Sequence, residues 1–219
     1  MFYFGVLLPR RAHRSMWITE EKLEGDFVIL EPLRPEHARQ LEDAVRDGEA
    51  WKLWFAGVPS PEEMQRYVED AINAAGKGDV AYAVRSKATG RLVGATRYYN
   101  VDAKNRRALI GYTWYAASAR RTPINTECKL LLLKKLFELH DAIAVEFRTH
   151  YFNQTSRTAI ERLGAKQDGI LRHHQIMRDG SLRDTVVYSI VAAEWPAVRS
   201  NLLSRLASRS SCNEAEKPR

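Results

Sequence analysis

The stretch IGYTWYAASARRTPINTECK, residues Ile110–Lys129, decides the fold of this chain. Its β-branched and aromatic residues predict a strand that ends near Tyr115, and the apolar spacing after Thr126 predicts a long helix. A short polar loop with Arg120 and Arg121 joins the two. The stretch therefore predicts a strand that enters a helix through a basic loop.

This loop is a candidate site for a diphosphate. We expect Asn125 to cap the helix, whose N-terminus presents free N–H groups and about half a positive charge. Arg120 and Arg121 add paired donors for phosphate oxygens. The same residues are also consistent with a solvated loop and an ordinary helix cap, so local features leave both interpretations open.

A second window, RTHYFNQTSRTAIERLGA (Arg148–Ala165), has a similar organisation. A strand leads to Asn153, which is expected to cap a short helix, and Gly164 ends that helix. Ser156 lies one turn into the helix, where its hydroxyl can meet a ligand. A cap followed by a first-turn serine is also common without any ligand.

The rest of the chain predicts one mixed α+β domain over residues 17–206, with a strand–helix–strand unit at its centre. Residues 1–16 are expected to form an extension outside the fold, with Met1 or Met16 as the natural start, and residues 207–219 a polar tail. Periodicity and turn residues predict further strands at Phe27–Leu33, Val80–Arg85, Leu92–Tyr99, Ile170–Met177 and Thr185–Val191, and further helices at Pro35–Asp47, after Ser60, and at Glu194–Leu206.

Composition excludes several classes of protein. The formal net charge is +7, but residues 1–16 contribute three arginines and no acid, and the body is close to neutral. A basic face that would read nucleic acid is therefore not indicated. No window approaches the length of a membrane span. Cys128 and Cys212 have no metal-ligand spacing, so we expect no metal and a reducing, cytoplasmic setting.

Taken together, the motifs resemble the GNAT superfamily of acetyl-CoA-dependent N-acetyltransferases, and within it the RimJ/RimL-like branch. The resemblance covers roughly Glu24–Ala193. It implies a three-layer α+β (mixed α/β) fold, in which a mostly antiparallel sheet of six to seven strands splays at the cofactor site and carries helices on both faces. The motifs are Ile110-Gly111-Tyr112-Thr113-Trp114, Asn125-Thr126-Glu127-x-Lys129, Asn153-x-x-Ser156, Leu163-Gly164-Ala165, Gly169-x-Leu171-Arg172 and Asp184-Thr185.

The resemblance also implies roles for individual residues. The pantetheine arm of acetyl-CoA would lie beside the strand end at Trp114 and Tyr115 and contact Asn153. Ser156 would lie near the thioester sulfur and act as the acid. The diphosphate would be held by the loop residues Arg120, Arg121, Thr122, Ile124, Asn125 and Thr126.

The chain departs from the family pattern in three places. Pro123 and Asn125 stand at positions of the phosphate loop that are usually small. Ile160 occupies the position of a frequent tyrosine acid. Leu109 occupies that of a frequent glutamate base, and the alternative base position on the closing hairpin holds Gln175. Strand alternation predicts that His173 shares a face with Gln175, which makes it a candidate base; an exposed histidine without a role is the other interpretation.

The acceptor is expected to be a primary amine on a small molecule or at a peptide or protein N-terminus. Trp51, Trp54 and Tyr98 are candidates for the walls of its cleft, although aromatic residues of this kind also serve as core packing. A homodimer is possible. The missing tyrosine and glutamate leave open a CoA-binding sensor or scaffold without catalysis.

Overall fold

The computed structural model describes the backbone of residues 17–215 and the side chains of residues 17–208. One eight-stranded sheet forms the centre of the molecule, in the order β1-β2-β3-β4-β5-β6-β8-β7. Every pair of neighbours is antiparallel except β5 and β6. The strands are β1 (Leu23–Glu24), β2 (Val28–Pro32), β3 (Val80–Ser86), β4 (Leu92–Asp102), β5 (Arg107–Tyr115), β6 (Ala144–His150), β7 (Lys166–Ile176) and β8 (Leu182–Val191).

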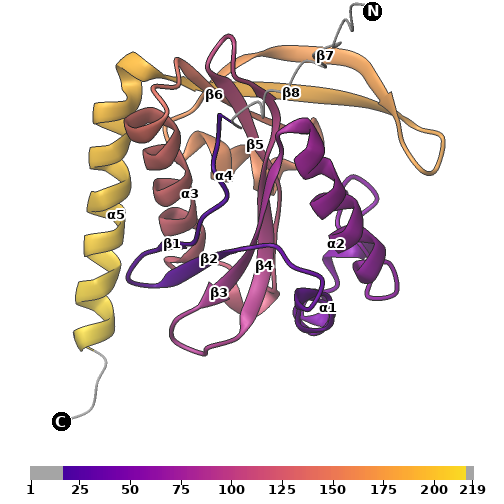
Figure 1. The fold of residues 1–219 in the computed structure, drawn as a ribbon, viewed down its shortest axis with the longest axis horizontal. Coiled ribbons are helices and arrows are strands. Elements are labelled where there is room, and N and C mark those ends of the chain that lie inside the picture. Colours follow the sequence, from indigo (N-terminus) through magenta and orange to yellow (C-terminus); the bar gives the residue numbers. More distant parts are fainter. Residues whose placement is uncertain (1–16, 216–219) are drawn as a thin grey trace, which may run out of the picture.

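Helices cover both faces of this sheet (Figure 1). The helices are α1 (His37–Arg46), α2 (Met64–Asn73), α3 (Ile124–Lys134), α4 (Gln154–Glu161) and α5 (Trp195–Ala215). α1 and α2 lie on one face, and α3 and α5 pack together on the other. The three-layer mixed fold is therefore confirmed, and the two-residue β1 adds one strand to the seven that were predicted.

Element boundaries differ from the predictions at two helix ends. α5 continues to Ala215, past the expected boundary at Leu206. The helix predicted after Ser60, α2, begins only at Met64, after a turn in which the Glu63 carboxylate accepts the Ser60 N–H. The expected extension at 1–16 lies outside the described residues.

Two cores hold the layers together because the sheet is apolar on both faces. Towards α3, Tyr98 is fully buried and its hydroxyl donates to the Leu132 carbonyl at 2.7 Å. Towards α1 and α2 the sheet presents small residues such as Ala83 and Ala95, against which Leu41 and Val68 pack. Small side chains let these helices lie close to the strands.

α3 is fastened to the edge of the sheet by a buried carboxylate. Glu127 accepts the backbone N–H groups of Asp26, Phe27 and Val28 at 2.7–2.8 Å. A Cβ on Gly25 would lie 2.3 Å from the Glu127 carboxyl carbon, so only glycine fits there. This contact holds the turn between β1 and β2 against the helix that follows the basic loop.

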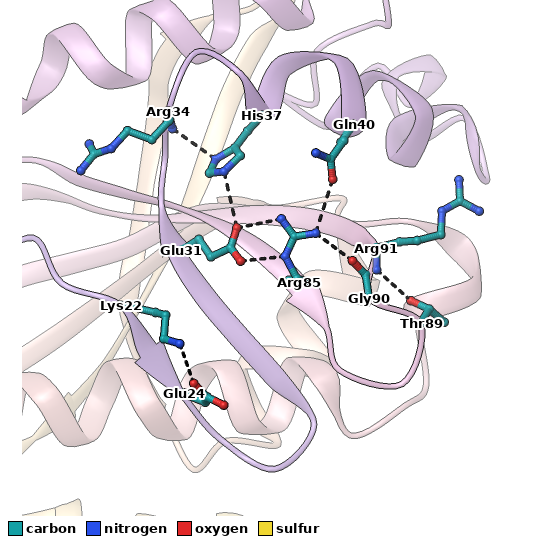
Figure 2. Close-up of polar contacts among 10 residues, drawn as sticks. All are labelled: Lys22, Glu24, Glu31, Arg34, His37, Gln40, Arg85, Thr89, Gly90 and Arg91. Atoms are coloured by element: carbon teal, nitrogen blue, oxygen red, sulfur yellow. Dashed lines mark hydrogen bonds and ion pairs between the residues drawn. The ribbon is translucent and has the colours of Figure 1, made fainter.

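A second polar network joins α1 to the sheet (Figure 2). The Arg85 guanidinium donates two hydrogen bonds to Glu31, at 2.7 and 2.9 Å, and a third to the Gly90 carbonyl. His37 of α1 lies 3.5 Å from the same carboxylate. Mainly because of the Arg85 hydrogen bonds, the pKa of Glu31 lies below its ordinary value.

We expect Glu31→Gln to lower the free energy of unfolding by about 1–2 kcal/mol, because it removes the charge from a partly buried bidentate pair. Since the pKa of Glu31 is lowered on folding, the wild-type advantage is full above the unfolded pKa of 4.5 and shrinks as the pH falls through the folded value. Urea denaturation between pH 3 and 7 measures this. Glu24→Gln, which alters an exposed ion pair, is the control; equal effects of the two variants would contradict the prediction.

Candidate active site

The central feature of the site is the gap between β5 and β6. These parallel strands pair only from Arg107–Leu109 to Ala144–Glu146. Beyond Leu109 the two strands separate, and the edges that faced each other have no strand partner. Backbone N–H and C=O groups along such an edge can bind an extended ligand in the manner of an added strand.

A β-bulge in β5 accompanies this separation. Ala95 of β4 pairs with Trp114 and Arg97 pairs with Gly111, so Tyr112 and Thr113 together oppose the single residue between them on β4. Tyr112 has a left-handed φ of 50°. Bulges bend a strand and increase its twist, which explains why β5 turns away from β6 at this point.

The basic loop lies at the wide end of the gap. Thr122 donates to the Ala119 carbonyl at 2.7 Å and accepts the Ile124 N–H, while the Arg120 Nε donates to the Tyr115 carbonyl. α3 begins at Ile124, so Asn125 lies in its first turn and is not the cap. N–H groups in a first turn have no intrahelical acceptor and attract anions.

The loop fits a diphosphate despite its departures from the family pattern. Pro123 is itself the N-cap residue of α3, with a φ of −61° that suits a helix start. Its missing N–H therefore costs the helix no hydrogen bond. Arg120 and Arg121 are both exposed beside this N-terminus. The charge and the backbone donors expected for an anion site are present together.

Asn153 and Ser156 lie at the other helix N-terminus that borders the gap. The Asn153 Oδ1 accepts the Ser156 N–H at 3.0 Å, which confirms Asn153 as the N-cap of α4. Within the described part of the chain, the Ser156 hydroxyl has no hydrogen-bond partner. Both side chains are half-buried.

A cluster of aromatic side chains lies beside α4. The exposed ring of Trp54 lies 5.0 Å from the His150 ring and 5.9 Å from Phe152, and Phe55 completes the cluster. Trp51, three residues earlier, instead packs against the core under α1 and α2. Of the two tryptophans proposed for the acceptor cleft, Trp54 is therefore the one on the surface near α4.

His150, the last residue of β6, was not singled out from the sequence. It is 2% exposed, and its Nδ1 accepts the Phe152 N–H at 3.1 Å. Burial lowers the pKa of His150, so the neutral ring carries its proton on Nε2. That N–H is buried and has no partner among the described residues.

Tyr98 does not line the cleft as predicted, because its side chain lies in the α3-side core. Successive residues of a strand point to opposite faces, so its neighbour Tyr99 takes that place. The Tyr99 ring covers Gly111, where a Cβ would lie 2.6 Å from it, and contacts the Tyr112 ring at 5.0 Å. Because Gly111 has no side chain, the Tyr99 ring can lie over it and contact Tyr112 beside the bulge.

The alternation used to place His173 is also wrong. Leu171 pairs with Thr185 and Gln175 with Arg183, so three residues of β7 oppose Asp184 alone. His173 has a φ of 48°, is exposed, and its N–H donates to the Asp184 carboxylate. A bulge therefore breaks the simple period of two, and the role of His173 as a base remains a prediction without support from that pattern.

Lys129 is a buried cation directly behind the bulge. Its amine donates to the Thr113 hydroxyl at 2.7 Å and to the Thr96 hydroxyl at 3.3 Å, and the residue is 5% exposed. Burial lowers the pKa of Lys129 to about 8. The neighbouring Cys128 thiol is also buried, and its pKa is raised to about 12, so it is a poor nucleophile.

We predict that Lys129→Met removes the part of the pH dependence of the free energy of unfolding that comes from titration of the Lys129 amine. The pKa falls from 10.5 to about 8 on folding, so the unfolded state binds more protons between these values and wild-type stability rises with pH there. Relative to Lys129→Met, the free energy of unfolding of the wild type should rise by roughly 2.5 kcal/mol between pH 7 and pH 10. At pH 7 the variant should be no less stable, because the two threonine hydroxyls lie 2.8 Å apart and bond each other.

Chemical denaturation of both proteins between pH 7 and 10 tests this. Lys134→Met, which changes an exposed lysine of the same helix, is the control and should keep the wild-type pH dependence. Parallel curves for wild type and Lys129→Met would contradict the prediction.

Comparison with known proteins agrees with this geometry. Residues 28–166 match the family model of the acetyltransferase (GNAT) domain, which is more than half of the chain. The chain therefore belongs to the GNAT acetyltransferase family. No helix within residues 17–215 is long and apolar enough to cross a membrane.

Individual relatives and solved structures are similar to this chain. It is 32% identical over 106 residues to a Bacillus subtilis protein named "Putative ribosomal N-acetyltransferase YdaF"; the match covers 48% of this chain and only 57% of that protein. A GCN5-related N-acetyltransferase from Brucella melitensis superposes with a TM-score of 0.77 at 27% identity, covering 86% of both chains.

RimL, the ribosomal L7/L12 α-N-protein acetyltransferase, shares the fold with a TM-score of 0.70 at 20% identity, over 84% of this chain and 99% of its own. The predicted membership of the GNAT superfamily is confirmed by the family model, and the RimJ/RimL-like branch stays a prediction.

Proposed function

We propose that this protein transfers an acetyl group from acetyl-CoA to a primary amine, on a peptide or protein N-terminus or on a small molecule. The observation that carries the proposal is the gap between β5 and β6, which runs from the first turn of α3 to the first turn of α4. It offers anion-binding donors at one end and the Ser156 hydroxyl at the other.

The chain's own residues divide the binding of acetyl-CoA among them. Arg120, Arg121 and Thr122, together with the N–H groups of Ile124, Asn125 and Thr126, would hold the diphosphate. The edge of β5 that β6 leaves, near Trp114 and Tyr115, and the amide of Asn153 would hold the pantetheine arm. When bound, acetyl-CoA would supply the acetyl group as a thioester.

The side chains of Trp114 and Tyr115 act differently from their backbone. Trp114 is 5% exposed and packs against α1 and α2. The Tyr115 hydroxyl faces the Cys128 thiol, and burial raises its pKa well above the ordinary value. Both rings therefore fix the strand edge, and Tyr115 does not supply a proton.

Ser156 is proposed as the acid that protonates the departing thiolate. Its hydroxyl stands free at the start of α4, close to the Asn153 amide that caps the same turn. Ile160, one turn further on, is 8% exposed and has no proton to donate. The rest of the rate enhancement would come from holding the amine and the thioester together.

We expect Ser156→Ala to lower kcat about 10²-fold, the size of effect typical for loss of a general acid. The affinity for acetyl-CoA, measured by calorimetry, should change little, because the hydroxyl is not among the anion-binding groups. Thr155→Ala removes an exposed hydroxyl from the same turn and should leave kcat unchanged. A wild-type kcat in Ser156→Ala would remove the proposed role.

The function itself is tested by thermal shift with acetyl-CoA, followed by free-thiol release against a panel of amines and N-terminal peptides. Acetyl-CoA should raise the Tm, and at least one acceptor should release thiol. The alternative is a CoA-binding protein without turnover. It is favoured by the buried, apolar side chains of Leu109 and Ile160 at the positions where relatives carry a base and an acid. Stabilisation by acetyl-CoA without thiol release across the panel would select it.

A further inference from the structure

Arg97 of β4 is a buried charge that lacks a carboxylate partner. It is 7% exposed, and its Nε makes no hydrogen bond to any described residue. No aspartate or glutamate oxygen of the described residues lies within 4.0 Å of its guanidinium nitrogens. Buried arginines are nearly always paired, because leaving a charge unpaired away from water is costly.

Aromatic rings surround this guanidinium on the cleft side of the sheet. Its Cζ lies 4.2 Å from the centroid of Tyr112 and 5.9 Å from that of Tyr67. A cation–π contact contributes about 0.5–2 kcal/mol, which offsets only part of the cost of burying the charge. The rings orient the guanidinium but supply no negative charge.

A second cation lies on the closing hairpin, on the side of Tyr112. Arg183 of β8 is half-buried, and its Nε donates to the Thr185 hydroxyl at 2.9 Å. Burial lowers the pKa of Arg183, while Tyr99 and Tyr112 act in the opposite direction, so Arg183 lies on the side of Tyr112, one of the two rings that contact Arg97. Its guanidinium likewise has no carboxylate within 4.0 Å in the described part of the chain.

The nearby acids do not neutralise these two arginines. Glu146 is occupied by Arg148 and by Arg107, with which it forms ion pairs. Asp79 interacts with Arg97 by long-range electrostatic attraction, but the two residues form no ion pair. The cluster therefore keeps an excess of positive charge.

This cluster borders the proposed reaction centre. Tyr112 is part of the bulge where β5 leaves β6. Tyr67 also lines an open hollow of about 410 Å³ between the start of α2 and the turn of the β7–β8 hairpin. The hairpin extends over the α2 side of the sheet (Figure 1), where Arg178 bonds Glu63 at 3.0 and 3.2 Å. Arg97 does not itself line this hollow, but Tyr67 borders the hollow and lies next to the Arg97 guanidinium.

We propose that the acceptor carries a carboxylate close to its amine, and that Arg97, with Arg183, binds this carboxylate. The inference rests on the proposed function and deepens it, because it names the substrate class: primary amines that also carry a carboxylate. A guanidinium binds a carboxylate through two parallel hydrogen bonds, which would complete the pairing that Arg97 lacks.

Matched acceptors test the proposal in wild-type protein. The peptide arm compares Ser-Asp-Ala-Gly with Ser-Asn-Ala-Gly, both with amidated C-termini. The small-molecule arm compares alanine with alaninamide. We expect kcat/KM to be at least tenfold higher for the acid in one arm, which also shows whether a peptide or a free amino acid provides the carboxylate. Equal values, or a preference for the amides in both arms, would overturn the proposal.

Variants then assign the preference to Arg97. Arg97→Met should raise KM for the acidic acceptor at least tenfold and abolish the acid-over-amide ratio, with KM for acetyl-CoA unchanged. Arg91→Met changes an exposed arginine at the β3–β4 turn (Figure 2) and should keep the ratio. A ratio that persists in Arg97→Met would overturn the assignment. If that variant does not fold, Arg183→Gln replaces it, with a reduced ratio expected and an unchanged one counting against the proposal.

The outcome is separable from that of the proposed function. Thiol release from the amides alone would leave acetyl transfer intact and refute the acidic acceptor. If no acceptor releases thiol, acetyl transfer is refuted, and calorimetry with the same acid and amide pairs decides whether the Arg97 cluster binds carboxylates. Tighter binding of the acids, lost in Arg97→Met, would support the site; equal binding would refute it.

Discussion

The separation of β5 from β6 is the constraint on which the rest of the site depends. Two parallel strands that paired along their full length would satisfy each other's backbone groups and leave no room for a ligand. Here pairing stops after Leu109, and the bulge at Tyr112 and Thr113 turns β5 away. The helix N-termini of α3 and α4 follow these two strands in the chain, so the same separation places them at the borders of one gap.

The two faces of β4 give the sheet two different chemistries around that bulge. Thr96 points towards α3 and meets the buried amine of Lys129, while Arg97 points towards α2 and meets aromatic rings. Both cations are buried and neither has a carboxylate within 4.0 Å among the described residues. The hydroxyls satisfy Lys129, whose pKa falls towards the neutral range, whereas a guanidinium cannot lose its charge in this way.

The wrong predictions have different physical causes. For His173, the cause is that a period of two holds only in an unbroken ladder. The bulge of β7 inserts residues opposite Asp184 and moves His173 into a left-handed conformation. For Tyr98 the alternation was correct but the choice of face was not, since nothing local distinguishes the core face of β4 from the cleft face. Asn125 was expected to cap a helix that begins one residue earlier, at Ile124.

By itself, the sequence determined the order of strands and helices, the basic loop before α3 and the Asn153 cap of α4, because these follow from local periodicity and turn chemistry. It also contained enough motifs to indicate the family. Only the tertiary structure decided which side chains share the cleft. Arg97, Tyr112 and Arg183 are far apart in the chain, and a buried charge without a partner becomes visible only when every neighbour is in place.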